Sequence, residues 1–199
     1  MGKLLELLEK LVRAIFGPGD EQDTGEPEPA PQAPKAEAVT GWEGDPPYRY
    51  IDVSRYQGLI DWAQVAAAGY KGAMLKTVST NPKLSKRADG LYIDPTFEGN
   101  YRNARAAGLD VGVYYYTYAT SEAMADEELA MLRQAVYGKE FSLPVCVDVE
   151  ENKLKQLSTL DLSNLTAYAL EQVEKMGFYA QLYTYTGYKY ELDLSLIHI

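Results

Sequence analysis

Cysteine and histidine are almost absent from this sequence of 199 residues. It contains one cysteine, Cys146, and one histidine, His198. One cysteine excludes an internal disulfide and offers no zinc-ligand spacing. Because Cys146 lies within the apolar run 143–149, we expect a buried structural thiol. With its histidine in the penultimate position, the chain gives little support for a Ser-His or Cys-His catalytic pair. The sequence predicts neither a metal nor a cofactor.

Basic charge and long hydrophobic runs are also scarce. The formal net charge is −10, and residues 18–47 contain eight acidic side chains against a single base, Lys35. The rest of the chain has no basic stripe, which argues against nucleic-acid binding. Charged residues interrupt the apolar N-terminal stretch, so it is neither a transmembrane span nor a clear signal peptide.

The first 47 residues form two segments of different character. Residues 1–17 predict an amphipathic helix, because Leu4, Leu8 and Leu11 fall on one face. Such a helix lies on a membrane surface or pairs with another protein, and both alternatives stay open. Residues 18–47 are rich in Pro, Glu, Ala and Gly and cannot bury enough apolar surface to offset their ordering entropy. They predict a disordered, semi-extended linker.

From residue 48 onward, strand and helix patterns alternate. Strands are predicted over residues 48–53, 72–77, 110–116, 143–149 and 179–185. Helices are predicted over residues 61–68, 94–108, 121–137 and 161–176, the second with Asp94 as its N-cap and Pro95 at its first position. Repeated β-α steps imply a parallel sheet with right-handed crossovers, and polar strand ends favour a barrel. A doubly wound sheet is the alternative, although no Gly-rich phosphate loop follows the first strand.

Two acids end the apolar run at residues 143–150. Side chains at i and i+2 of a strand share a face, so Asp148 and Glu150 would lie side by side, roughly 6–7 Å apart along the backbone. Two carboxyl groups this close cannot both ionise freely. A protonated acid beside an ionised one is what cleavage of a glycosidic bond requires. Asp52, at the end of the first strand, would face the same cleft, whereas a plain acidic strand end is the alternative reading.

Tyrosines are abundant, and several end predicted strands. Tyr114 and Tyr116 lie on one face of the third strand, and Tyr183 and Tyr185 end the fifth. Sugar C–H faces stack on aromatic rings, so this rim suits a carbohydrate cleft. Lys76 ends the second strand, where it either keeps an acid charged or forms a salt bridge at the rim.

Five motifs carry a resemblance to a known family. They are Tyr-Ile-Asp-Val-Ser-Arg-Tyr-Gln-Gly at 50–58, Ile-Asp-Trp at 60–62, Asp-Pro-Thr-Phe-Glu-Gly-Asn at 94–100, Ala-Gly-Leu-Asp-Val-Gly-Val-Tyr-Tyr-Tyr at 107–116 and Leu-Pro-Val-Cys-Val-Asp-Val-Glu at 143–150. In this order they resemble glycoside hydrolase family 25, the Chalaropsis-type lysozymes, over residues 48–192. The phage-endolysin and clostridial type is the most similar. The resemblance implies an irregular TIM-like barrel of five β/α units followed by three strands.

The resemblance also implies an activity. Family members cut the β-1,4 bond between N-acetylmuramic acid and N-acetylglucosamine in peptidoglycan, so the resemblance implies action at the cell wall. Because this chain has no clear signal peptide, it would reach the wall by phage-encoded release or by non-standard export. Glu150 would be the general acid that protonates the leaving oxygen. Asp148 would stabilise charge at the sugar, directly or through the 2-acetamido group, and Asp52 would support the site. The candidate substrate-binding residues are Tyr114, Tyr116, Tyr185 and Lys76.

The resemblance ends near residue 192. The last three strands of the family are missing, and residues 193–199 look like a non-native tail. Because an incomplete barrel exposes two sheet edges, we expect a polypeptide of these 199 residues to fold poorly and to be nearly inactive. Two other functions stay open, namely a non-catalytic module that binds cell-wall glycan and a chitinase-like hydrolase. The chain has only the last two acids of the longer chitinase signature D-x-x-D-x-D-x-E.

Overall fold

The computed structural model describes residues 48–188 and 190–197. The predicted helix over residues 1–17, the predicted linker over residues 18–47 and His198 lie outside the described residues. None of the helices in the described part of the chain is long and apolar enough to cross a membrane.

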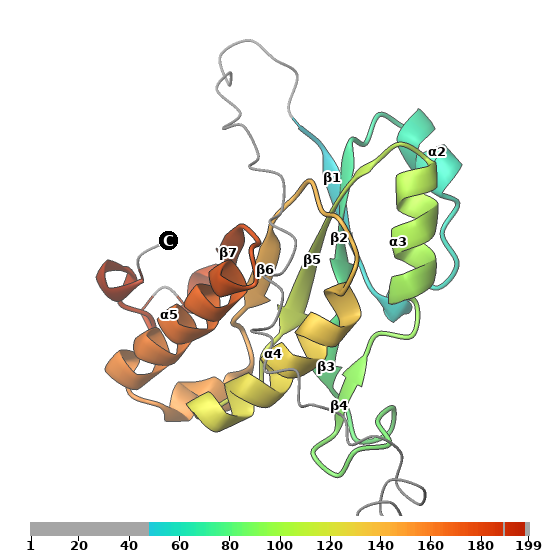
Figure 1. The fold of residues 1–199 in the computed structure, drawn as a ribbon. Coiled ribbons are helices and arrows are strands. Elements are labelled where there is room, and N and C mark those ends of the chain that lie inside the picture. Colours follow the sequence, from blue (N-terminus) through green and yellow to red (C-terminus); the bar gives the residue numbers. More distant parts are fainter. Residues whose placement is uncertain (1–47, 189, 198–199) are drawn as a thin grey trace, which may run out of the picture. The chain divides into compact units, whose positions relative to one another are not determined.

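A five-stranded parallel sheet forms the centre of the fold (Figure 1). Its strands, in spatial order, are β1 (Tyr50–Val53), β2 (Gly72–Lys76), β5 (Asp110–Tyr116), β6 (Val145–Asp148) and β7 (Ala180–Tyr183). All neighbouring strands pair in parallel. The spatial order follows the chain order, without the reversal that a doubly wound sheet requires. The predicted mixed α/β fold with a parallel sheet is therefore confirmed, whereas closure into a barrel stays a prediction.

Helices alternate with these strands. They are α2 (Trp62–Ala67), α3 (Phe97–Ala106), α4 (Glu122–Val136) and α5 (Thr159–Lys175), with short 3₁₀ turns η1 (Arg55–Gln57), η2 (Asn152–Gln156), η3 (Thr186–Tyr188) and η4 (Leu194–Leu196). Three helices have an N-cap residue whose side chain accepts a hydrogen bond from a backbone N–H of the first turn. These residues are Asp61 for α2, Ser121 for α4 and Ser158 for α5.

Two predicted helix starts are wrong. Thr96, and not Asp94, occupies the N-cap position of α3, which leaves Pro95 outside the helix. The Asp94 carboxylate instead accepts hydrogen bonds from the N–H and the hydroxyl of Thr96, at 2.9 and 2.7 Å. Helix α5 begins at Thr159, two residues before the predicted start, because Ser158 caps it.

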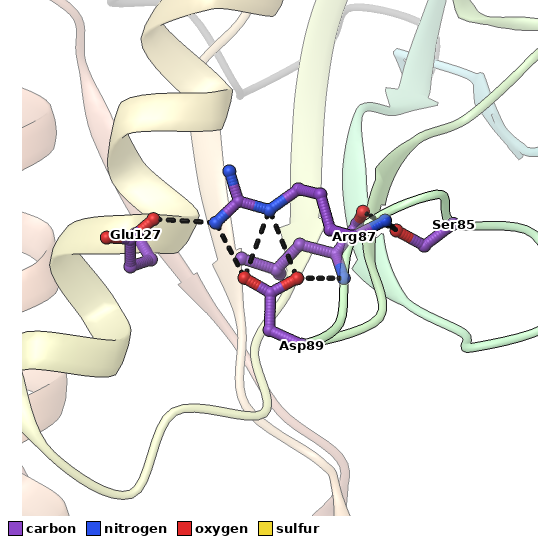
Figure 2. Close-up of polar contacts among 5 residues, drawn as sticks. Ser85, Arg87, Asp89 and Glu127 are labelled. Atoms are coloured by element: carbon purple, nitrogen blue, oxygen red, sulfur yellow. Dashed lines mark hydrogen bonds and ion pairs between the residues drawn. The ribbon is translucent and has the colours of Figure 1, made fainter.

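An antiparallel hairpin after β2 was not predicted. It consists of β3 (Val78–Thr80) and β4 (Leu91–Ile93), joined by the loop 81–90. Arg87 fixes this loop to α4, because its Nη2 lies 2.6 Å from Asp89 Oδ2 and 2.7 Å from Glu127 Oε2 (Figure 2). At its other end the hairpin follows Thr77, whose N–H donates to the carbonyl of Tyr114 at 2.8 Å.

The two faces of the sheet differ in chemistry. Side chains of one alternating set, including Leu75, Val113 and Val147, are fully buried in the core with apolar residues of the helices. Burial of each such side chain stabilises the fold by about 1.5–3 kcal/mol. The other set carries the acids, Lys76 and most of the tyrosines discussed above, so the packed face holds the sheet in place and the opposite face carries the chemistry.

Residues that follow η3 also pack on the fold. The Asp193 N–H donates to Ser163 Oγ on α5 at 2.8 Å, and Ile197 is buried. The assignment of residues 193–199 as a non-native tail stays a prediction.

Candidate active site

Strand register places the candidate residues on one face, near the carboxyl ends of the strands. Asp148 of β6 pairs with Tyr116 of β5 on one side and with Tyr183 of β7 on the other. Paired residues of neighbouring strands project to the same face of a sheet. Two residues earlier in β5, Tyr114 pairs with Lys76 of β2. The register therefore brings Asp148, Tyr116, Tyr114 and Lys76, together with Tyr183, to one face of β2, β5, β6 and β7.

Asp148 is the most perturbed acid of this face. Its side chain is only 5% exposed, and its Oδ1 atom has no hydrogen-bond partner among the described residues. Burial raises the pKa of Asp148 to about 8, and the charges of Glu150 and Asp52 add to the rise while Lys76 opposes it. Asp148 therefore holds a proton at neutral pH in the free protein, beside a half-buried Glu150.

Lys76 supplies the positive charge at this site. Its Nζ lies 4.8 Å from the ring centroid of Tyr116 and 5.7 Å from that of Tyr114, within cation–π range. Burial lowers the pKa of Lys76, while the charges of the surrounding acids, Asp148 first among them, oppose this shift. No carboxylate in the described part of the chain lies within ion-pair distance of this ammonium group. The rim salt bridge that was the alternative role of Lys76 is thus not formed there.

Asp52 of β1 lies on the same face of the sheet as Lys76. Its Cα partner is Met74, two residues before Lys76 in β2, so both side chains project to the same face. Burial raises the pKa of Asp52, whereas hydrogen bonding to Tyr114 and the charge of Lys76 lower it. Burial and the charge of Asp52 raise the pKa of Tyr114, which therefore stays a neutral phenol. Asp52 and Tyr114 form a linked pair on the β1 side of Asp148.

Cys146 lies on this face as well but carries no reactive signature. Burial raises the pKa of its thiol, and the nearby charges of Asp148 and Asp52 raise it further. A neutral buried thiol is a poor nucleophile. In the described part of the chain, no cluster of three or more His, Cys, Asp or Glu side chains is arranged to hold a metal ion.

One face of the sheet thus carries a buried aspartate next to a half-buried glutamate, a second aspartate, an ammonium group and several tyrosines. The family model for glycosyl hydrolases family 25 matches residues 51–197. This chain belongs to glycosyl hydrolase family 25. The resemblance inferred from the sequence motifs is confirmed.

Several known proteins are similar to this chain in sequence or in fold. It is 31% identical over 125 residues to the protein YegX of Escherichia coli K12, covering 63% of this chain and 43% of that protein. It is 32% identical over 105 residues to lysozyme M1 of Streptomyces globisporus, covering 51% and 32% of the two chains. The autolysin LytC of Streptococcus pneumoniae, solved with a synthetic peptidoglycan ligand, has a similar fold with a TM-score of 0.62 at 21% identity, over 74% of this chain and 35% of LytC. The chain spans less than half the length of each of these three proteins.

Two tyrosines that were not predicted, Tyr118 and Tyr188, lie next to the candidate site of this family 25 chain. The ring of Tyr118, in the loop after β5, lies 5.2 Å from the ring of Tyr116. On the other side, Tyr185 lies 5.3 Å from the buried Tyr188, whose hydroxyl donates to the carbonyl of Glu151. Tyr116 ends β5 as predicted, whereas β7 ends at Tyr183, so Tyr185 lies just beyond the strand that was predicted to contain it. Tyr118 was not predicted, because a residue in a loop has no strand periodicity to reveal it.

Glu128 of α4 supports the loop that carries Tyr118, and the sequence analysis missed it too. Its Oε2 accepts from the Thr117 hydroxyl at 2.6 Å, and its Oε1 accepts from the Tyr118 N–H at 2.8 Å. Thr117 Oγ1 accepts in turn from the Ala119 N–H at 3.2 Å. Burial raises the pKa of Glu128 to about 7, although these hydrogen bonds lower it. Three consecutive loop residues are thus tied to one buried carboxyl group.

Proposed function

We propose that this chain is a peptidoglycan hydrolase that cleaves the β-1,4 bond between N-acetylmuramic acid and N-acetylglucosamine. The observation that carries the proposal is the buried Asp148, with one carboxyl oxygen left without a partner, next to Glu150 and facing Asp52 and Lys76. Leaving a buried carboxyl oxygen unsatisfied costs free energy, which a substrate donor would recover. The lysozyme named among its relatives supports the same substrate.

Glu150 is the general acid in this proposal. It is half-buried and follows the end of β6, where a carboxyl group can reach both the cleft and solvent. Its proton passes to the glycosidic oxygen as the bond from that oxygen to C1 breaks, so the leaving sugar departs as a neutral alcohol. Water then supplies the hydroxyl group at C1 and a proton that restores the acid.

Asp148 stabilises the positive charge that develops at C1 and the ring oxygen. It does so directly, or by accepting a hydrogen bond from the 2-acetamido N–H while the acetamido oxygen approaches C1. Either role requires the carboxylate form, and Lys76 favours that form, because its charge lowers the pKa of Asp148. Asp52, hydrogen-bonded to Tyr114, adds negative charge on the opposite side.

A second assignment exchanges the two acids. Asp148 has a pKa raised to about 8, so it holds a proton at neutral pH and could itself be the proton donor. The charge of Glu150 adds to the raised pKa of Asp148, so the proton affinity of Asp148 depends on this neighbour. Glu150 remains our first choice, because it is more exposed and can exchange its proton with water in each cycle.

Release of new reducing ends tests the reaction. Release by the wild-type chain from purified peptidoglycan, with N-acetylmuramic acid at the new reducing end by mass spectrometry, would support the proposal. It would also contradict the expectation, made from the sequence, that these 199 residues are nearly inactive. Glu150→Gln should lose 10²- to 10⁴-fold in rate, the usual contribution of a general acid. Glu174→Gln, an exposed glutamate variant on α5, is the matched control and should keep full activity. Unchanged activity in Glu150→Gln would exclude Glu150 as the acid.

The same assay separates the other functions. Binding to peptidoglycan without any product would indicate a non-catalytic module, and preferential cleavage of chitin would indicate a chitinase-like hydrolase. To separate the two acid assignments, we would use an aryl glycoside with a good leaving group, which needs no protonation. The variant that removes the acid, Glu150→Gln or Asp148→Asn, should regain most of its activity on this substrate, whereas the other variant should not.

A further inference from the structure

A cationic and aromatic shelf continues from the proposed active site. We define the Arg55 shelf as Arg55, Tyr56, Tyr92 and Tyr118. It joins the site through Tyr118, whose ring lies 5.2 Å from that of Tyr116. Burial raises the pKa of Tyr118, and the neighbouring Glu151, Tyr92 and Tyr56 add to the rise, which places those phenols close to it. The shelf combines residues from η1, from the β3–β4 hairpin and from the loop after β5.

The charge of Arg55 has no acidic partner among the residues that the structure describes. Its Nη2 donates to the Tyr56 hydroxyl at 2.9 Å, and its guanidinium carbon lies 4.2 Å from the centroid of the same ring. Hydrogen bonding to Tyr92 is the main cause that raises the pKa of Arg55. Within the described ranges, no carboxylate forms an ion pair with this guanidinium, and its Nε is buried without a partner. The group is therefore positioned by tyrosine hydroxyls and keeps its positive charge.

The backbone beneath Arg55 is fixed. Ser54 and Gln57 form a capping box around η1, with the Ser54 N–H donating to Gln57 Oε1 at 2.8 Å. The Arg55 N–H donates to Oδ2 of the buried Asp94 at 3.0 Å. Asp94 thus binds the backbone of Arg55 and leaves the guanidinium free of a carboxylate. A rigidly held cation with unused donors suits recognition of an anion.

We propose that the Arg55 shelf binds a carboxylate of the muramyl substituent and so selects peptidoglycan over neutral glycans. This inference rests on the proposed function. In peptidoglycan every second sugar carries a lactyl ether, which ends in a free carboxylate or in a stem peptide with its own carboxylates. Chitin carries neither. Arginine pairs with carboxylates through two parallel hydrogen bonds, and the tyrosine rings offer flat surfaces for the adjoining sugar or peptide.

Steady-state kinetics on three glycans test the inference. The first is soluble peptidoglycan fragments with stem peptides, and the second is the same strands after amidase treatment, which removes the peptides and frees the lactyl carboxylates. The third is the neutral N-acetylglucosamine tetramer, measured as a competitive inhibitor. For Arg55→Gln we expect KM to rise about tenfold to a hundredfold on a carboxylate-bearing substrate, the range for a charged hydrogen bond. We expect kcat to stay within about twofold and the inhibition constant of the tetramer to stay unchanged.

The arms of the experiment identify the source of the carboxylate. A loss confined to the first substrate assigns it to the stem peptide, and a loss confined to the second assigns it to the lactyl group. Arg55→Lys, which keeps a positive charge, should recover part of the loss, and Arg102→Gln on the exposed surface of α3 is the control. Should Arg55→Gln fail to fold, the salt dependence of the wild-type protein replaces this variant as the test. The wild-type KM should then rise with NaCl on the two acidic substrates, and the affinity for the neutral tetramer should not change.

Two results would overturn the inference. Equal KM values for wild type and Arg55→Gln on both acidic substrates would do so, as would an equal loss of affinity for the neutral tetramer, which would indicate a structural role. In the salt experiment, a KM independent of NaCl has the same meaning. A wild-type chain that cleaves peptidoglycan while Arg55→Gln is unaffected refutes this inference alone. A wild-type chain that cleaves no peptidoglycan refutes the proposed function as well.

Discussion

Glu128 should make the stability of this protein depend on pH. Its side chain is 2% exposed, and burial raises its pKa from 4.5 to about 7. Because the folded state binds this proton more tightly than the unfolded state, the stabilisation is fully present below pH 4.5. It is lost as the pH rises through 7. With one pKa unit worth about 1.4 kcal/mol, linkage gives a loss of about 2–3 kcal/mol between pH 5 and pH 8.5.

Glu128→Gln removes the titration and keeps the size of the side chain. Its amide N–H₂ meets the Thr117 hydroxyl, which costs stability equally at every pH, so the variant can be less stable than wild type throughout. Its free energy of unfolding should nevertheless fall about 2–3 kcal/mol less than that of wild type between pH 5 and pH 8.5. The raised pKa of Asp148 affects both proteins alike and cancels in this comparison.

Urea unfolding followed by circular dichroism at the two pH values measures this difference. Glu174→Gln, at an exposed position of α5, should follow the wild-type curve. Parallel pH dependence of wild type and Glu128→Gln would refute the reasoning, because it would show that Glu128 has the same proton affinity in both states. A single cooperative transition in wild type would also contradict the expectation, made from the sequence, that these 199 residues fold poorly.

Two further predictions concern the site and the hairpin. Between pH 7 and pH 9, wild type should lose about 1 kcal/mol more stability than Asp148→Asn. The reason is that the pKa of Asp148 is raised to about 8, so stability is lost as this carboxyl group ionises. Equal losses in the two proteins, measured by urea unfolding, would contradict that pKa. Arg87→Ala should leave the Tm nearly unchanged, because its ion pairs are exposed, but should speed trypsin cleavage after Lys83 or Lys86 in the loop 81–90; an unchanged cleavage rate would show that Arg87 does not hold this loop.

The sequence predicted the parallel strands and the convergence of the acids because both follow from short-range periodicity. The predicted strand over residues 110–116 coincides with β5, where apolar residues alternate over seven positions. The i, i+2 rule, together with the rule that parallel strands end at one edge, placed Asp52 and Asp148 on a common face. The roles assigned to these residues stay predictions, since they depend on a substrate.

The β3–β4 hairpin could not be predicted by the same rules. Each of its strands has only three residues, and the loop between them is ten residues long, so neither alternation nor a tight-turn signal marks it. Its pairing depends on tertiary contacts such as Thr77 with Tyr114 and Arg87 with Glu127. Periodicity cannot reveal such contacts between residues 37 or 40 positions apart.

Glu128 did leave a signal in the sequence. Ala125, Leu129, Leu132 and Val136 form the buried face of α4. Position 128 falls on this face by helical spacing, whereas Glu127 falls outside it. A glutamate on the apolar face of a helix is buried only with partners, so its position alone could have indicated a polar contact inside the core, although this was not predicted. The identity of those partners, Thr117 and the Tyr118 N–H, required the structure.

These neighbouring glutamates connect α4 to two segments that contribute to the Arg55 shelf. Glu127 holds Arg87 in the loop of the β3–β4 hairpin, and Glu128 holds the loop that carries Tyr118. The hairpin contributes Tyr92 and the second loop contributes Tyr118, which are two of the four members of the Arg55 shelf. Because the first contact is exposed and the second is buried, their loss should have different consequences. Removing Glu127 frees one loop at little cost in stability, whereas removing Glu128 leaves buried donors without an acceptor and displaces Tyr118 together with the core around it.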